Sequence, residues 1–193
     1  MKNITYWLSL VSLVASLHAV EALADSAVDP TTPSLSMRKE FETIAPSTIP
    51  GNIIESLSQD WMLISAGTET NFNGMTASWG GLGVWNRPVA FILVHPKRHT
   101  FKFIEREEYF TLSFFDEKYR PALKLFGTKS GRDIDKTKAA GLTAMSVSNS
   151  IAYAEANLII LCKKRFSTPT SKDNPDDSHT LYFGDIVSVW KHK

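Results

Sequence analysis

The run from Asn71 to Gly83 combines residue types suited to contact with a flat, partly polar ligand. It reads Asn-Phe-Asn-Gly-Met-Thr-Ala-Ser-Trp-Gly-Gly-Leu-Gly. Glycines let a planar molecule approach the backbone, and hydroxyl and amide side chains can hydrogen-bond to its polar edge. The same composition is typical of a turn that leads into a strand. On its own, the run leaves both interpretations open.

Two later segments carry groups suited to a phosphate. Residues 96–100 read Pro-Lys-Arg-His-Thr and stand between an apolar run and a helical pattern. A helix start offers free N–H groups and a partial positive charge, and Arg98 adds a bidentate donor. Residues 127–136, Gly-Thr-Lys-Ser-Gly-Arg-Asp-Ile-Asp-Lys, form a polar loop that opens another helix. The alternatives are a solvated basic turn for the first segment and helix capping by Asp133 for the second.

Composition and spacing exclude several kinds of site. The formal net charge of +1 gives no electrostatic case for binding nucleic acid or an anionic membrane. A single cysteine, Cys162, excludes an internal disulfide, a CxxC redox pair and a structural zinc site. His95 and His99 flank a proline at a strand end without a clear carboxylate partner, so no metal site is expected. Ser130 lacks the glycine frame of a nucleophile elbow, and its loop lacks the order of a P-loop.

The elements that must position these segments are mostly strands. Six or so strands, interrupted by short helices, predict a mainly β fold: a split antiparallel (Greek-key) barrel with short peripheral helices. A Rossmann fold needs regular strand–helix alternation and a third glycine where Asn86 stands. The predicted strands are 61–65, 73–79, 89–94, 109–115, 157–163 and 180–190, and the predicted helices are 37–44, 101–107, 117–126 and 133–140.

The first residues predict an export signal. Lys2 precedes an apolar run, and Ala22-Leu23-Ala24 has the small-x-small form that signal peptidase needs, which places cleavage before Asp25. The run is shorter than the roughly 18 to 20 residues of a membrane span, so stable membrane insertion is not expected. The sequence therefore predicts a signal peptide over 1–24, a leader with a short helix over 25–45, and one domain over 46–193 that is exported to the periplasm.

Taken in order, these segments resemble the flavin reductase-like family of FMN-binding split barrels. A further segment, His179-Thr-Leu-Tyr-Phe-Gly-Asp-Ile-Val187, is similar to the closing strand of that family, His-x-x-Phe/Tyr-x-Gly-Glu/Asp-x-Val. The resemblance extends over about residues 61–190. It implies non-covalent FMN at the rim of a split barrel, in a homodimer with residues of both chains near the cofactor.

The resemblance also implies which residues contact the cofactor. The flavin ring lies along the strand that begins near Asn73 and the loop after it, and the phosphate lies around residues 97–100. His179 is the one side chain that could serve flavin or nicotinamide chemistry, although a histidine at a strand start is more often a surface or hydrogen-bonded residue. The residues expected to bind the cofactor are Asn73, Met75, Thr76, Ala77, Ser78, Trp79, Arg98, Thr100, Ser130, Gly131, Arg132 and Lys136.

The function that the resemblance implies is hydride transfer from NAD(P)H to flavin, because a nicotinamide stacks on the flavin in enzymes of this family. The predicted export conflicts with that function, since NAD(P)H is not expected outside the cytoplasm. Two alternatives follow: an exported FMN-binding electron carrier fed by another redox protein, and a flavin-binding module without turnover. FMN is preferred to FAD because one phosphate site, and no adenine pocket, can be recognised.

Overall fold

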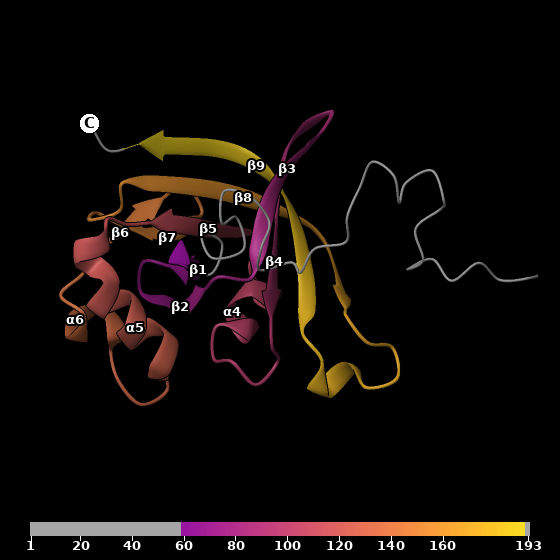
Figure 1. Ribbon diagram of the computed structural model, residues 1–193, viewed down its shortest axis with the longest axis horizontal. Helices are drawn as coiled ribbons and strands as arrows, with labels where there is room; N and C mark the ends of the chain where they lie inside the picture. Colours follow the sequence, from indigo (N-terminus) through magenta and orange to yellow (C-terminus); the bar gives the residue numbers. More distant parts are fainter. Residues whose placement is uncertain (1–58, 192–193) are drawn as a thin grey trace, which may run out of the picture. The chain divides into compact units, whose positions relative to one another are not determined.

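The computed structural model describes residues 59–191. The predicted signal peptide, the leader and the helix at 37–44 therefore lie outside the described residues. Within the described part the chain forms nine strands and a few short helices, so the predicted mainly β, antiparallel fold is confirmed (Figure 1). None of the described helices is long and apolar enough to cross a membrane.

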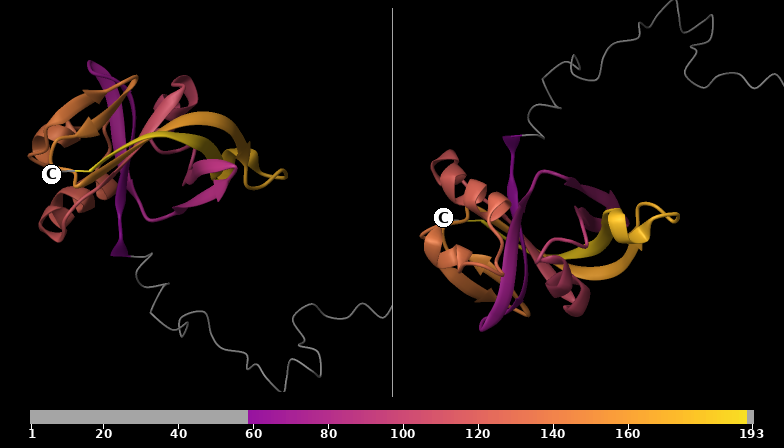
Figure 2. Two further views of the ribbon diagram at one scale, coloured as in Figure 1. Left: turned by 90° about the horizontal axis from the view of Figure 1, so that it is seen from above. Right: turned by 90° about the horizontal axis from the view of Figure 1, so that it is seen from below.

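Seven strands form one antiparallel sheet in the order β2-β1-β5-β8-β9-β4-β3. β2 and β3 lie at opposite edges, yet only Ser78 and Trp79 join them. In a flat sheet the two edges would be about 29 Å apart, and so short a link spans at most about 11 Å. The sheet must therefore curl into a barrel that stays split between its edges (Figure 2). The strands are β1 Met62–Thr68, β2 Asn71–Ala77, β3 Gly80–Trp85, β4 Arg87–Val94, β5 Tyr109–Phe114, β8 Leu158–Pro169 and β9 Thr180–Lys191.

The main core fills the inside of this barrel. Alternate side chains of the strands point inward, among them Ile64, Ile92 and Ile160, and all three are buried. Helix α4 (Phe101–Arg106) packs against this core with Phe103 and Ile104, which are both buried. The barrel thus supplies a rigid support for the loop that precedes α4.

A second apolar cluster lies on the outer face of β1. Helix α5 (Arg120–Thr128) contributes Leu123 and Phe126, and strand β7 (Ser150–Tyr153), paired with β6 (Ala144–Val147), contributes the buried Tyr153. Ser65 on β1 donates a hydrogen bond to the Tyr153 hydroxyl at 3.2 Å. This packing holds α5 beside β2. The remaining short elements are η2 Glu117–Tyr119, α6 Lys136–Ala139 and η3 Pro175–Asp177.

Several elements differ from the sequence prediction. β3 was not predicted, because three of its six residues are glycines, which strands disfavour. The β6–β7 hairpin was not predicted either, since each strand has only four residues. Helix α5 does not stop at Gly127 but continues to Thr128, and α6 is shorter than the predicted helix 133–140.

Candidate functional site

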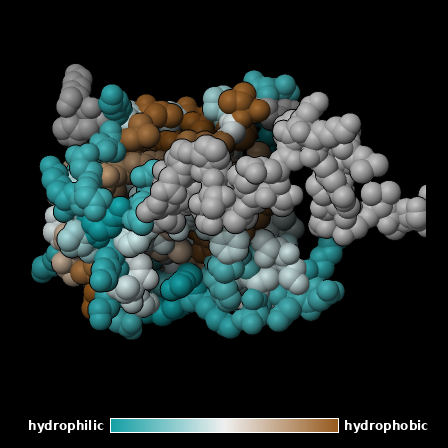
Figure 3. Space-filling view, viewed as in Figure 1, coloured by the Kyte–Doolittle hydropathy of each residue, from teal (hydrophilic) through white to brown (hydrophobic). Residues whose placement is uncertain are grey.

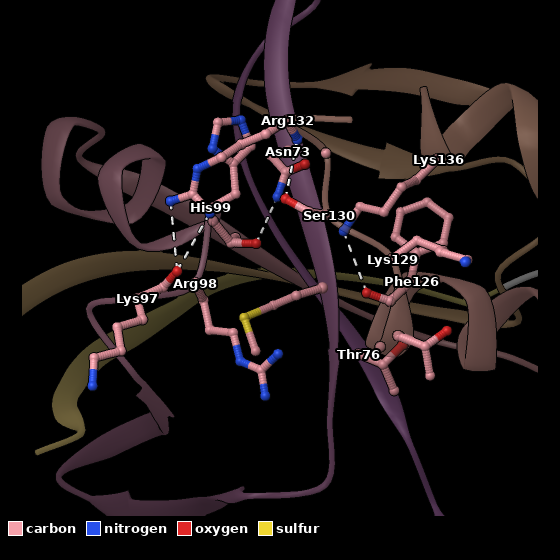
Figure 4. A pocket seen from close by; sticks show the side chains of 15 residues that line it. Asn73, Thr76, Lys97, Arg98, His99, Phe126, Lys129, Ser130, Arg132 and Lys136 are labelled. Atoms are coloured by element: carbon pink, nitrogen blue, oxygen red, sulfur yellow. Dashed lines mark hydrogen bonds between the residues drawn. The ribbon is translucent and has the colours of Figure 1, made fainter. Parts of the chain in front are cut away.

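The free edge of β2 borders a cavity of about 160 Å³, referred to below as the β2 cavity (Figure 4). β2 pairs only with β1, so every second residue directs its backbone N–H and C=O away from the sheet. The carbonyl of Gly74 faces this way, because it accepts a hydrogen bond from the ammonium of Lys136, which lies outside the sheet. Thr76, two residues later, has the same orientation. The cavity is lined by Asn73, Met75, Thr76, Lys97, Arg98, His99, Thr100, Phe126, Gly127, Thr128, Lys129, Ser130, Gly131, Arg132 and Lys136.

Nine of the twelve residues expected to bind a cofactor line this cavity together. They come from three separate segments: β2, the loop between β4 and α4, and the loop that follows α5. The other three, Ala77, Ser78 and Trp79, are not among its lining residues. Ser78 instead borders a separate apolar cavity of about 200 Å³, and Ala77 packs against the barrel core. The nine are Asn73, Met75, Thr76, Arg98, Thr100, Ser130, Gly131, Arg132 and Lys136.

Asn73 connects the three segments. Its side-chain amide donates to the hydroxyl of Thr100 at 2.7 Å and to the carbonyl of Gly74 at 3.2 Å. Its side-chain oxygen lies against Gly131, where an added Cβ would come within 2.0 Å of it. Through these contacts with Thr100 and Gly131, Asn73 fixes the positions of the two loops around β2.

Thr76 ties β2 to helix α5. Its hydroxyl donates to the carbonyl of Leu123 at 2.5 Å, and its Cβ lies 3.4 Å from the position that a Cβ on Gly127 would take. The hydroxyl is therefore engaged within the protein. The groups that Thr76 offers to a ligand are its backbone N–H and C=O on the strand edge.

The mouth of the cavity is cationic. Arg132 reaches across to the carbonyl of Lys97, at 3.4 and 3.5 Å, and its backbone N–H donates to the Ser130 hydroxyl at 3.2 Å. Lys97 pairs with Asp177, which lies in the segment before β9. Lys129 and Arg98 add two further positive charges, and no aspartate or glutamate is among the lining residues. The arrangement favours an anionic ligand.

Lys136 supplies a cation deep in the wall. Its side chain is only 6% exposed, and its ammonium donates to the carbonyls of Gly74 and Phe126, the latter at 3.3 Å. The ammonium also lies 5.0 Å from the centre of the Phe126 ring. Burial, followed by repulsion from Arg98, lowers the pKa of Lys136 to about 8.

His99 stands between the two loops and lacks a partner for one ring nitrogen. Its Nδ1 atom is buried and has no hydrogen-bond partner in the described part of the chain. Burial lowers the pKa of His99 below its usual value, and repulsion from Lys102, Arg132 and Lys136 lowers it further. The neutral imidazole is favoured as a result, and its Nδ1 is free to bond to a ligand.

His179 lies beside the β2 cavity but is not among its lining residues. Its ring packs on Trp79 at a centroid distance of 4.6 Å and on the edge of His95 at 5.1 Å. Burial lowers the pKa of His179, with smaller contributions from His95 and Arg98. His95 is itself oriented by the backbone N–H of Lys97, which donates to its Nδ1 at 3.1 Å.

Sequence reasoning did not select several residues that line the cavity. Lys97, His99 and Lys129 stand inside the quoted polar segments, so a positive charge or a ring nitrogen beside a selected residue was the available signal. Phe126 belongs to the second apolar cluster, while its carbonyl and ring also contact Lys136. That double role follows from the end of α5 lying beside β2, which no local pattern indicates.

Comparison with known proteins gives one family and a consistent fold. Residues 54–193 match the model of the flavin reductase like domain. A search among curated proteins finds no significant match. Among solved structures, flavoredoxin from Desulfovibrio vulgaris is 21% identical with a TM-score of 0.61, covering 69% of this chain and 70% of its own.

Two further structures have the same fold. Nitrilotriacetate monooxygenase component B from Bacillus cereus is 18% identical with a TM-score of 0.62, over 79% of this chain and 82% of its own. A protein with a split barrel domain from Shewanella frigidimarina is 22% identical with a TM-score of 0.61, over 72% and 71%. At these identities the structures establish the split-barrel fold alone.

Proposed function

Since the chain belongs to the flavin reductase-like family, we propose that the β2 cavity binds FMN non-covalently. The observation that carries this proposal is a cavity with several cations and no carboxylate among its lining residues, placed on a free strand edge. A phosphate matches the cations, and a pyrimidine edge matches strand backbone groups, which present one donor and one acceptor per residue.

Each part of the wall has a distinct role in this proposal. Arg98 and the Ser130–Arg132 loop hold the phosphate, and the Thr76 backbone meets the polar edge of the ring. Asn73 keeps both loops in place through Thr100 and Gly131. Ala77, Ser78 and Trp79 follow directly along the chain, toward the rim, where a ring longer than the cavity would extend. The cation-rich wall fits a phosphate, because the buried ammonium of Lys136 bonds only to carbonyl groups and the buried Nδ1 of His99 has no hydrogen-bond partner in residues 59–191.

The reaction we propose is hydride transfer from NAD(P)H to flavin. FMN, when bound, supplies the hydride-accepting chemistry, and the chain supplies binding and orientation. Such a reaction requires no acid–base pair from the protein. His179, packed between Trp79 and His95 beside Arg98, is the side chain positioned to contact a co-substrate at the rim.

We propose that a second copy of the chain covers the exposed apolar face. This face comprises Leu82 and Val84 on β3 and Val187 and Val189 on β9, all exposed. Figure 3 shows apolar surface along this side of the molecule. Large contiguous apolar patches are uncommon on monomers and mark association sites. A homodimer would remove this surface from water.

A second candidate function is that of an exported FMN-binding electron carrier. The observation that favours it is the predicted signal peptide over 1–24, which would place the 46–193 domain in the periplasm, away from nicotinamide cofactors. The donor would then be another redox protein, and the cationic mouth would favour an acidic one. A binding module without turnover is the third possibility.

The test is an absorbance spectrum of the protein after FMN is added and the excess is removed, followed by anaerobic NADH or NADPH. Retained flavin that bleaches supports a nicotinamide-linked reductase. Retained flavin that does not bleach, but is reduced by dithionite, supports the electron carrier. Loss of all flavin on desalting at micromolar protein would contradict FMN binding at the β2 cavity. Intact-mass measurement of periplasmic and cytoplasmic fractions tests cleavage before Asp25.

A further inference from the structure

Lys136 is a buried cation without an anionic partner in residues 59–191. Its hydrogen bonds go to two carbonyl groups, those of Gly74 and Phe126. None of the ion pairs found among the described residues includes it. Lysines are almost never this buried unless they are paired, because removing a charge from water is unfavourable.

The charges around Lys136 do not supply the missing anion. Arg98 in the loop before α4 and Arg132 in the loop after α5 are both positive, and His99 stands between the two loops. Asp135, the adjacent residue, accepts a hydrogen bond from the backbone N–H of Lys138 and caps α6. The Tyr153 hydroxyl, on the inner side, is bonded to Ser65. Two groups complete the set: Asp133, whose charge acts on His99, and the cation of Lys102 on α4.

Lys136 borders two cavities: one is lined in part by Asp135, and the other is the β2 cavity, which is lined by no carboxylate. A ligand in that cavity can therefore provide the negative charge that the surrounding protein does not. A phosphate group is fully ionised above neutral pH, since its second pKa is about 6. It would hold the ammonium in its charged form, whereas the empty cavity favours loss of the proton.

We propose that Lys136 makes flavin binding proton-linked: the neutral amine of Lys136 takes up a proton and becomes an ammonium when a flavin phosphate enters the β2 cavity, so that the cavity selects FMN over riboflavin near neutral pH and loses this selectivity in alkaline solution. The proposal rests on the proposed FMN binding. It adds that one buried side chain, rather than the exposed cations of the mouth, determines how affinity depends on pH.

The sign follows from the two protonation equilibria. In the empty cavity the pKa of Lys136 is about 8, and a bound phosphate raises it. Between those two values, binding takes up one proton, so the dissociation constant for FMN rises about tenfold for each pH unit. Riboflavin carries the same ring without the phosphate, and its dissociation constant should stay flat over the same range.

The experiment measures dissociation constants for FMN and riboflavin by flavin fluorescence between pH 7 and pH 9.5. For the unmodified protein, we expect the FMN constant to rise at least tenfold and the riboflavin constant to change by less than threefold. Calorimetry in buffers of different ionisation enthalpy should show uptake of up to one proton with FMN near pH 8.5. A flat FMN curve with normal binding would overturn the proton linkage and leave FMN binding intact.

Two variants separate charge from packing. Lys136→Arg keeps a cation that does not titrate in this range, so FMN binding should become independent of pH. Lys136→Met removes the charge, and the preference for FMN over riboflavin should fall at neutral pH. Lys129→Met, an exposed cation at the mouth, is the matched control: it should weaken FMN binding without removing the pH dependence.

A steep pH dependence that persists in Lys136→Arg would assign the proton to another group and overturn the proposal. If FMN does not bind at any pH, the proposed function fails. Calorimetric titration with inorganic phosphate between pH 8 and pH 9.5, in the same set of buffers, then decides the proton linkage, which requires an anion but not a flavin.

Discussion

The two free edges of the sheet have opposite characters. The edge of β2 is covered by two polar loops and by the ammonium of Lys136, which bonds to the strand carbonyl of Gly74. Among residues 59–191 no strand pairs with the outer edge of β3, and its Leu82 and Val84 side chains are exposed, the latter by 81%. Uncovered edges invite pairing with other chains. These characters support the proposal that one edge binds a small ligand and the other a second polypeptide.

Glycines serve both edges in different ways. At the β2 edge they allow close packing: a Cβ on Gly74 would come within 2.5 Å of the Tyr153 hydroxyl, and one on Gly131 within 2.0 Å of Asn73. At the outer end of β3, a Cβ on Gly83 would meet only an ordinary contact with Val89 at 3.7 Å. The comparison shows that the β2 edge is fixed by tight contacts, whereas this part of the β3 edge has room to change.

The largest expected effect concerns the stability of the ligand-free protein. The pKa of Lys136 is about 8 in the folded protein and has its ordinary value of 10.5 in the unfolded chain, so between pH 8 and pH 10 the unfolded chain binds more protons. Stability from this group therefore rises with pH, by about 2 kcal/mol over that interval. Urea denaturation of the wild type and of Lys136→Met at both pH values measures it.

The variant is needed because other groups titrate in the same window. Burial raises the pKa of the Cys162 thiol to about 12 and that of Tyr153 to about 12, so both reduce stability as the pH rises. Both groups are present in Lys136→Met, and the difference between the two proteins isolates Lys136. An equal pH dependence of stability in the two proteins would mean that burial does not lower the pKa of Lys136.

Gly131→Ala tests the tight packing of the β2 edge directly. The new methyl group would collide with the Asn73 side chain and displace the loop that carries Ser130 and Arg132. Overpacking of this kind costs about 1 to 3 kcal/mol, so FMN affinity should fall about 10- to 100-fold. Gly83→Ala on β3 is the matched control and should leave affinity unchanged. Equal affinities for both variants would show that the Asn73–Gly131 contact does not shape the cavity.

Part of this contrast was predictable from the sequence. The order of the polar segments predicted the family, the split barrel and nine residues of one cavity. The sequence does not show which residues of the strand face a ligand, so residues throughout the segment from Asn73 to Trp79 were predicted to contact the cofactor. In the structure the strand ends at Ala77, and Ser78 turns toward another cavity. The β3 edge was not predicted at all, because its glycines conceal a strand whose stability comes from pairing with β4.

The burial of Lys136 was also beyond sequence reasoning. Lys136 was predicted to contact the cofactor because the segment 130–136, Ser-Gly-Arg-Asp-Ile-Asp-Lys, resembles the family. Its contact with the carbonyl of Gly74, 62 positions away, depends on α5 and β2 lying side by side. Long-range packing of this kind decides whether a lysine is a surface cation or a buried one, and a local pattern carries no information about it.

Val84→Lys tests the apolar character of the β3 edge. A lysine on an exposed edge strand opposes association, and Val84 has almost no contacts to lose within its own chain. We expect the dissociation constant of the homodimer to rise about tenfold, which corresponds to about 1.4 kcal/mol. Sedimentation equilibrium measures it. Glu69→Lys, an exposed change of charge outside the apolar face, is the control. Unchanged association in Val84→Lys would mean that a dimer, if formed, uses another surface.

The smallest expected effect distinguishes two neighbouring hydroxyls on the β2 side. Thr76→Val removes the hydrogen bond to the Leu123 carbonyl and loosens α5 against the cavity, so FMN affinity should fall about threefold, within the range of one hydrogen bond. Ser78→Ala should change affinity less, because Ser78 borders the separate apolar cavity. Fluorescence titration at pH 7.5 compares them. A larger loss in Ser78→Ala would place the ring beyond the end of β2 and extend the polar, ligand-binding edge toward β3.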